Sequence, residues 1–412
     1  MDGAPNRPAP VDRPLTGSSP GRDTVHRMKI LMAAVGGSGH TFPLIPLAQE
    51  LRDAGHAVTF ATSAAMADTV ASAGLDVLVA GSGAGEALAL ARERRRTLED
   101  PAAPGFELRV AGDTFGDVMP RALAADLAAW IDRDRPDLVI AETACLGASL
   151  AATLAGVPCV LHSFGRFEVD SPLIQDIFRA FATVLADFGL PPLGHGELLG
   201  HACVDVCPPS LQAPPTGAST AYVPMRTTAW NPPMPPGPAR PDPVRPWVYL
   251  TLGTVVGNVA AIRAAVEGLT RLDVDVLVAA GAIPTDQLAD LPGSVRVEAF
   301  VPQAELLKDF SLVVHHGGSG TTLGAAQHGV PQLLLPHGAD QFTNAAAVTA
   351  LGAGLSLQGE EITADAVEQA AATLLADGPH RAAVARLAEE IAEMPTAKTV
   401  ASEVETWARP LR

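Results

Sequence analysis

Short apolar runs alternate with helix-patterned stretches along most of the chain, beginning near Met28. In the first half, apolar runs of strand length cover residues 29–34, 56–62, 75–80, 138–141 and 157–162. Between the first two runs, Leu44, Leu47 and Leu51 recur at helical spacing until Gly55. Strands that alternate with helices predict a parallel sheet covered on both faces. Residues 81–121 are less regular, and we expect loops and a helix above the sheet there.

Prolines are dense between residues 208 and 246, and the run 232–238 contains five of them. Proline at this density is incompatible with a helix or with the interior of a sheet. The segment is therefore predicted to be a stiff linker with a defined path. We place the linker between the two domains at residues 226–246.

The same alternation restarts after the linker. Strands are expected at 247–252, 274–279, 295–298, 312–315 and 332–335, with helices at 259–269, 321–327, 344–351 and 364–375. The chain is thus predicted to be α/β, with Rossmann-like domains at 28–225 and 247–393 and a C-terminal helix, 394–412, crossing back to the first. Two parallel sheets would face each other across a cleft, where open α/β sheets bind ligands.

Composition narrows the class of protein. The formal charge of −17 on 412 residues argues against binding to nucleic acid or to an anionic membrane. No apolar run reaches the ~18 residues that a membrane span needs. Residues 1–27 lack the apolar centre of a secretory signal and are expected to be a disordered extension. The four cysteines form no C-x-x-C pair, so we expect reduced thiols in a cytoplasmic protein.

A glycine-rich turn in the second half has the composition of a diphosphate site. The segment 313–323 runs from a buried strand through Gly317, Gly318 and Gly320 into a helix. Glycines allow close approach of a ligand, and a helix N-terminus offers free N–H groups and a positive dipole end. Ser319 and Thr321 add hydroxyl groups. The turn matches neither the P-loop nor the dinucleotide fingerprint, and an ordinary tight strand-to-helix turn is the alternative.

His40 is the candidate general base. It closes the turn 36–40 in the first half, at the start of a helix whose dipole disfavours imidazolium and keeps the ring neutral. A base histidine needs an orienting acid, and Glu142 follows a neighbouring strand at the same sheet edge. The alternatives are a loop histidine that fills space and a solvated carboxylate.

A third group of polar residues follows the strand at 332–335. Asp340 and Gln341 offer acceptors and donors suited to sugar hydroxyls. Asp at a helix N-terminus is also commonly just a cap. Taken alone, this signal is weak.

In order and spacing, the segments 39–44, 249–254, 300–303 and 315–321 resemble bacterial natural-product glycosyltransferases of antibiotic pathways. These enzymes decorate macrolides, enediynes and aromatic polyketides, and the calicheamicin-type members are the most similar. The resemblance extends from Met28 to about Pro395. It implies the GT-B fold, in which the first domain binds the acceptor and the second binds a nucleotide sugar.

The resemblance also implies residue roles. His40 would deprotonate the acceptor with Glu142 as its partner, although relatives often have Asp at the second position. The resemblance assigns the other residues to four binding sites. They are the acceptor loop (Gly39, Thr41 and Phe42), the site of the nucleotide's heterocyclic base (Phe300, Val301 and Gln303), the diphosphate site (Gly253, Thr254, His316, Gly318, Ser319, Gly320 and Thr321) and the sugar site (Asp340 and Gln341).

One departure bears on the donor. Plant uridine-diphosphate enzymes carry a ribose-binding Glu where this chain has Gly324. We therefore hypothesise a 2′-deoxy nucleotide and hence a TDP-sugar donor. The D-x-D pairs at 132–134 and 273–275 lie outside the predicted cleft, so neither a metal nor a cofactor is expected.

The sequence as a whole predicts an inverting, metal-independent glycosyltransferase that acts on a hydrophobic natural-product acceptor. The expected partners are a nucleotide sugar and that acceptor. Whether the protein forms a homodimer is left open by the sequence. Two alternatives remain. One is a nucleotide-sugar epimerase, which would need further acid or base carboxylates in the cleft. The other is a non-catalytic protein that activates another transferase, and such a protein would not need His40.

Overall fold

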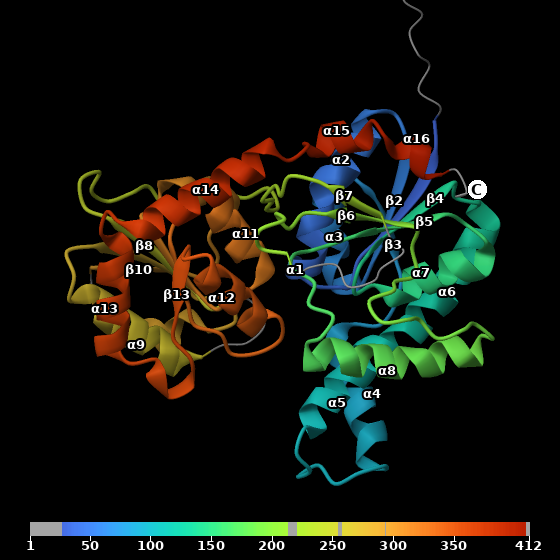
Figure 1. Ribbon diagram of the computed structural model, residues 1–412, viewed down its shortest axis with the longest axis horizontal. Helices are drawn as coiled ribbons and strands as arrows, with labels where there is room; N and C mark the ends of the chain where they lie inside the picture. Colours follow the sequence, from blue (N-terminus) through green and yellow to red (C-terminus); the bar gives the residue numbers. More distant parts are fainter. Residues whose placement is uncertain (1–26, 213–220, 254–257, 293, 409–412) are drawn as a thin grey trace, which may run out of the picture.

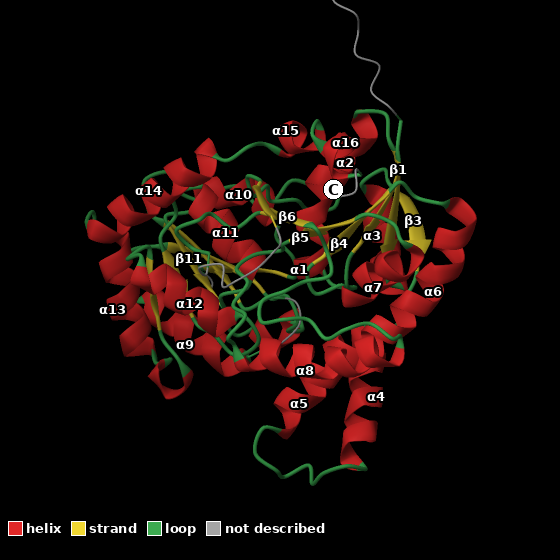
Figure 2. Ribbon diagram, turned by 45° about the vertical axis from the view of Figure 1, so that its right-hand side comes forward, coloured by secondary structure: helices red, strands yellow, loops and turns green. Residues whose placement is uncertain are grey.

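Two lobes lie side by side, each a parallel sheet flanked by helices (Figures 1 and 2). This computed structural model describes residues 27–212, 221–253, 258–292 and 294–408. The predicted pair of parallel α/β halves is confirmed. Within the described residues, no helix is both long and apolar enough to cross a membrane.

The N-terminal lobe is built on a seven-stranded sheet of order β3-β2-β1-β4-β5-β6-β7, in which all neighbours are parallel. Its strands are β1 (Lys29–Ala33), β2 (Ala57–Thr62), β3 (Asp76–Val79), β4 (Leu138–Glu142), β5 (Cys159–His162), β6 (Ala202–Asp205) and β7 (Ala221–Pro224). Its helical segments are α1 (Ser38–Thr41), η1 (Phe42–Leu44), α2 (Ile45–Asp53), α3 (Ala64–Ser72), α4 (Ala84–Arg96), α5 (Phe106–Asp113), η2 (Thr114–Val118), α6 (Met119–Asp134), α7 (Leu146–Ala155) and α8 (Pro172–Asp187).

The C-terminal lobe has a six-stranded parallel sheet of order β10-β9-β8-β11-β12-β13. Its strands are β8 (Trp247–Thr251), β9 (Asp275–Ala279), β10 (Val295–Glu298), β11 (Leu312–His315), β12 (Gln332–Leu334) and β13 (Gly354–Ser356). Its helical segments are α9 (Val259–Thr270), η3 (Thr285–Leu288), α10 (Gln303–Leu306), η4 (Leu307–Asp309), α11 (Ser319–Gln327), α12 (Gln341–Ala350), η5 (Gly359–Glu361), α13 (Ala364–Leu375) and α14 (Pro379–Glu393).

Strand order decides where ligands can bind. The chain winds outward in both directions from the adjacent pair β1 and β4, and likewise from β8 and β11. The loops that follow such a pair diverge, and they leave a crevice at the carboxyl ends of the strands. The loops after β1 and β4 carry His40 and Glu142, and those after β8 and β11 carry Gly253 and His316.

Apolar side chains fill both faces of the N-terminal sheet. Alternation along β1 directs Met32 to the α2 side and Leu31 to the side of α6 and α8, and both are fully buried. The α2-side core continues into the other lobe through Leu323 and Ala345. One apolar core thus holds the two lobes together.

The C-terminus joins the lobes along one side. Helix α14 packs on the C-terminal lobe, whereas α15 (Ala397–Ala401) and α16 (Val404–Trp407) lie beside α2 (Figure 1). Ser210 of the N-terminal lobe donates from its amide to Glu390 of α14 at 2.9 Å. Beyond α14, the amide of Arg226 donates to the carbonyl of Pro395 at 2.6 Å.

Two expectations about the N-terminal lobe need correction. Residues 81–121 are largely helical, because α4, α5, η2 and the start of α6 cover them. The proline-dense segment also contributes a strand, since β7 ends at Pro224 on the edge of the sheet, where proline is tolerated. The sequence pattern predicted neither the short strands β6 and β13 nor helix α14.

Candidate active site

His40 and Glu142 meet at the carboxyl edge of the N-terminal sheet. Strands β1 and β4 are neighbours in register, Ala33 opposite Ala141, so the residues that follow them emerge side by side. His40 Nδ1 lies 3.2 Å from Glu142 Oε2. The Glu142 side chain is fully buried, whereas 27% of the His40 side chain is exposed. The imidazole is therefore anchored by Glu142, while part of the side chain remains exposed.

Further contacts fix the Glu142 carboxylate. Its Oε1 accepts a hydrogen bond from the Ala144 amide at 2.6 Å and one from the Thr143 hydroxyl at 3.2 Å. A carboxylate held in this way selects the histidine tautomer with hydrogen on Nδ1. The lone pair then lies on Nε2, as a general base requires.

The electrostatics of His40 differ from the expectation of a ring kept neutral by the helix end. Burial lowers the pKa of His40, but the charge and hydrogen bond of Glu142 and the charge of Asp340 outweigh it, so the pKa is raised. The direction of the shift is opposite to the one expected from the helix end, because the buried Glu142 carboxylate is in contact with the ring. Asp340 belongs to the other lobe, so its influence shows that the two lobes converge here.

The glycine-rich turn faces this edge from the C-terminal lobe. Gly317 has a φ of +91°, which only glycine adopts readily, and Gly318 is the N-cap of α11. His315 holds the turn from behind, since its Nδ1 accepts from the Gly317 amide at 3.1 Å and its Nε2 contacts Gln332 at 2.9 Å. The first amides of α11 are thereby left pointing out of the helix end.

His316 is enclosed by glycines on both sides. A Cβ atom on Gly253 would lie 2.8 Å from the ring, and one on Gly318 would lie 2.5 Å away. Its Nδ1 is buried without a hydrogen-bond partner among the described residues. Burial lowers the pKa of His316 to about 4. A neutral, partly unsatisfied imidazole at a helix N-terminus is suited to meet an anion.

Comparison with known proteins agrees with this geometry. The family models described as the N-terminal and C-terminal domains of erythromycin biosynthesis protein CIII-like proteins match residues 49–253 and 263–407. The chain is 38% identical to an L-demethylnoviosyl transferase of Streptomyces niveus, over 91% of this chain and 97% of that protein. It is therefore a member of the erythromycin CIII-like glycosyltransferase family.

Two further relatives support the assignment. Identity is 30% with the TDP-daunosamine transferase DnrS of Streptomyces peucetius, over 92% of this chain and 96% of that protein. The glycosyltransferase SsfS6 of Streptomyces sp. SF2575, whose crystal structure is a complex with thymidine diphosphate, gives a TM-score of 0.75. That match has 28% identity and covers 92% of this chain and all of that one. The GT-B fold and the glycosyltransferase class are thus confirmed.

The other residues expected to bind the donor belong to the C-terminal lobe. Thr321 Oγ1 contacts Gln303 Oε1 at 3.3 Å, which ties α11 to the start of α10, directly after the loop that follows β10. That loop exposes 40% of Phe300 and buries Val301, whose carbonyl accepts from the Gln303 amide. A Cβ atom on Gly320 would meet nothing within 4 Å, so the helix end is open there. Thr254 lies outside the described residues.

The predicted sugar-reading pair has its own supports. Gln341 Oε1 accepts from the amides of His337 and Gly338 at 2.8 and 3.1 Å, which leaves its amide nitrogen for a ligand. Asp340 Oδ2 accepts from Ser319 Oγ at 2.7 Å and from Asn344 Nδ2 at 3.0 Å. The carboxylate therefore has one oxygen engaged by the protein.

The acceptor loop is less uniform than expected. Nothing lies within 4 Å of the position a Gly39 Cβ would take. Thr41 is fully buried and its hydroxyl contacts the Val35 carbonyl, so it supports the loop from within. Phe42 packs edge-on against Trp230 of the linker at a ring distance of 5.0 Å. Gly39 is thus exposed, Thr41 is buried and Phe42 is partly buried.

Sequence reasoning missed a neighbour of the base. The Phe164 ring lies 4.6 Å from the His40 ring, and it is carried by the loop after β5. The position of this loop at the carboxyl end of a strand was the available signal, but an aromatic residue in a loop has no periodic context. Asn344 was missed because polar residues in a helix are most often solvated.

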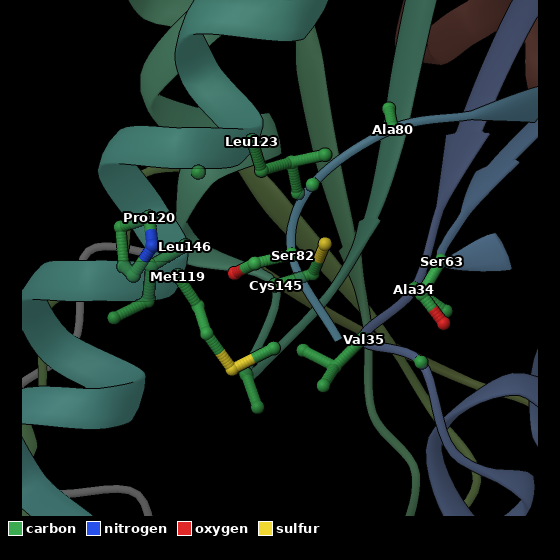
Figure 3. Close-up of a pocket in the computed structure, with 14 residues that line it drawn as sticks. Ala34, Val35, Ser63, Ala80, Ser82, Met119, Pro120, Leu123, Cys145 and Leu146 are labelled. Carbon is green, nitrogen blue, oxygen red and sulfur yellow. The ribbon is translucent and has the colours of Figure 1, made fainter. Parts of the chain in front are cut away.

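A small hollow lies between the carboxyl edge of the N-terminal sheet and helices α6 and α7 (Figure 3). Its volume, open mouth included, is about 350 Å³. The loops after β1 and β4 line it next to His40 and Glu142, through Val35 and Cys145, and Met119 and Leu123 complete an apolar wall.

The two D-x-D pairs are engaged in ion pairs with arginine. Asp273 and Asp275 both contact Arg245, at 2.9 and 3.0 Å. Asp132 pairs with Arg135 at 2.8 Å. In the part of the chain that the structure describes, no three His, Cys, Asp or Glu side chains are grouped to hold a metal ion.

Proposed function

We propose that this glycosyltransferase moves a sugar from a TDP-sugar to a hydroxyl of a hydrophobic natural product, with inversion and without a metal ion. The observation that carries the proposal is the His40–Glu142 dyad, which faces the glycine-rich turn of the other lobe across the cleft. The two groups that sugar transfer needs, a base and an anion site, thus come from opposite lobes.

His40 acts on the acceptor. Its Nε2 takes the proton of the acceptor hydroxyl while the oxygen forms a bond to the anomeric carbon of the sugar. The resulting imidazolium is stabilised by Glu142, which already raises the pKa of His40 in the free protein. General base catalysis of this kind contributes about 10²–10⁴-fold to a rate.

The C-terminal lobe receives the leaving group. As the bond between the anomeric carbon and the diphosphate breaks, negative charge grows on the phosphate oxygens. The free amides at the start of α11 and the dipole of that helix oppose this charge. His316 adds a donor, since a diphosphate beside it raises its pKa from the low value that burial imposes.

The arrangement of the two lobes supports inversion. The acceptor oxygen approaches from the side of the N-terminal lobe, and the nucleotide leaves toward the C-terminal lobe. A single displacement with these groups on opposite faces of the sugar inverts the anomeric carbon.

The environment of Gly324 supports a TDP-sugar donor. Gly324 is buried in α11, and a Cβ atom there would lie 2.7 Å from Leu307 Cδ1. A longer side chain here would have to displace the end of the Leu307 side chain, and glycine supplies no carboxylate for a ribose hydroxyl. The names of two relatives point the same way, one as a TDP-daunosamine transferase and one as a complex with thymidine diphosphate. We expect TDP to bind more tightly than UDP, and tighter UDP binding in calorimetry would refute this.

A panel experiment tests the function itself. The protein is incubated with several TDP-sugars, each with a set of phenolic and macrolide acceptors, and products are identified by mass and by the anomeric configuration in NMR. We expect a glycoside of inverted configuration in the presence of EDTA. A glycoside with retained configuration, or an isomerised sugar formed from the donor without acceptor, would contradict the proposal.

A further inference from the structure

Three polar side chains form a closed hydrogen-bonded cluster behind the glycine-rich turn. Ser319 begins α11, Asp340 precedes α12, and Asn344 lies one turn into α12. Ser319 Oγ donates to Asp340 Oδ2 at 2.7 Å. Asn344 Nδ2 lies 3.0 Å from the same carboxylate oxygen, 3.1 Å from Ser319 Oγ and 2.9 Å from the Gly317 carbonyl. The cluster connects the diphosphate turn to the residue expected to read the sugar.

Counting hydrogens shows what the Ser319 hydroxyl can do. A serine hydroxyl has one hydrogen to donate, and Ser319 gives it to Asp340. Its oxygen faces the Asn344 amide, which donates and cannot accept from it. The side chain is therefore engaged within the protein and has no hydrogen left for a phosphate oxygen.

The opposite lobe covers the same hydroxyl. A Cβ atom on Gly165, in the loop after β5, would lie 2.3 Å from Ser319 Oγ. The N-terminal lobe thus lies against the Ser319 side chain, which is only 6% exposed. A phosphate group that contacted Ser319 Oγ would have to displace the loop that places Phe164 beside His40.

The hydrogen bonds that hold Asp340 leave one of its carboxylate oxygens for the substrate. Two donors hold Oδ2, so the carboxylate has a fixed orientation and its Oδ1 is available to a ligand. Asn344 is 3% exposed, so this support is well shielded from water. A hydrogen bond to a charged group contributes more than a neutral one, and it is worth more when water is excluded.

We propose that Ser319 and Asn344 are positioning residues that hold the Asp340 carboxylate for the donor sugar, and that the Ser319 hydroxyl does not bind the diphosphate. This inference rests on the proposed function, because it assumes a nucleotide sugar in the cleft. It revises the role that the family resemblance implied for Ser319, whose backbone amide remains at the helix N-terminus.

Ser319→Ala separates the two roles. The probes are TDP and whichever TDP-sugar the wild-type protein consumes in the donor panel. We expect the Kd of TDP, measured by calorimetry, to stay within about twofold, because the backbone donors are unchanged. The kcat/KM for the TDP-sugar is expected to fall roughly 10- to 100-fold, the range for a lost hydrogen bond to a charged group. Thr322→Val is the matched control, since among the described residues the Thr322 hydroxyl donates only to the Gly318 carbonyl at the start of its own helix.

A double-mutant cycle tests whether Ser319 acts through Asp340. If it does, adding Ser319→Ala to Asp340→Ala lowers kcat/KM no further, whereas independent effects would multiply. A large loss of TDP affinity in Ser319→Ala would overturn the proposal, and so would an unchanged kcat/KM or multiplying effects. A wild-type protein that consumes no TDP-sugar would instead refute the proposed function.

Discussion

At the scale of single residues, the function proposed here depends on one carboxylate that acts on one imidazole. Glu142 is fully buried, and its second oxygen is held by the backbone, so its orientation toward His40 is fixed. The same contact that orients the ring also raises the pKa of His40. A base of higher pKa accepts the acceptor proton more readily, although a larger fraction of it is protonated near neutral pH.

Glu142→Gln keeps the size of the side chain and removes its charge. The pKa of His40 should then fall, because the largest contribution that raises it is lost. The acidic limb of the pH profile of kcat/KM, where His40 becomes protonated, should move to lower pH. At the optimum the rate should fall about 10- to 100-fold, as for other orienting partners of histidine. A limb that stays in place, or moves to higher pH, would contradict this role for Glu142.

At the scale of elements, the sequence was sufficient wherever a periodic pattern was long or buried. Strands β10 and β11 and helix α13 match their predicted bounds, and α9 differs by one residue. The segment 81–121 was misjudged because glycine and proline interrupt its helices and its apolar faces contact α8 rather than the sheet. Strand β13 was missed because it has three residues, of which Leu355 alone is strongly apolar. Length alone does not explain why β6 was missed, since β10 and β11 are equally short.

The same limit applies to the site. Strand ends and glycine-rich turns located His40, Glu142 and the diphosphate turn, because their position in a parallel sheet follows from topology. The contacts of Asn344 and Phe164 depend on how two lobes pack together, and no local pattern reports such packing. The Ser319 hydroxyl shows this limit most clearly. Its hydrogen-bond partner Asp340 lies on a different element, so the sequence around Ser319 does not reveal the contact.

Helix α8 is held in place by a close contact with η2. A Cβ atom on Gly116 would lie 2.2 Å from the Ile177 carbonyl. Gly116→Ala should therefore lower the free energy of unfolding by about 1–3 kcal/mol through overpacking. Gly85→Ala in α4 is the control, because nothing lies within 4 Å of that position and alanine favours a helix. Urea unfolding measures both, and equal stabilities for the two variants would argue against this contact.

At the scale of the whole molecule, catalysis needs the two lobes close together. They are joined by a shared apolar core, by the hydrogen bond from Ser210 to Glu390 of α14 and by the contact of Gly165 with Ser319. The last contact lies beside the cleft, between the loop that carries Phe164 and the diphosphate turn. The distance between His40 and the leaving diphosphate therefore depends on the size of the side chain at position 165.

Gly165→Ala should hold the lobes apart. Its Cβ would overlap Ser319 Oγ at 2.3 Å and Ser319 Cβ at 2.4 Å. Because a cost of about 1–3 kcal/mol is expected for such overlap, kcat should fall roughly tenfold or more. The Kd of TDP should change little, since the nucleotide is bound by the C-terminal lobe. If Gly165→Ala lost TDP binding but kept kcat, the two lobes would not need this contact for catalysis.

The most direct measurement compares sugar transfer and TDP binding in His40→Ala. The account predicts that turnover falls about 10²–10⁴-fold, because the acceptor hydroxyl loses its base, while the Kd of TDP stays within about twofold. Turnover close to that of the wild-type protein would contradict the central claim, because the acceptor would then lose its proton without His40.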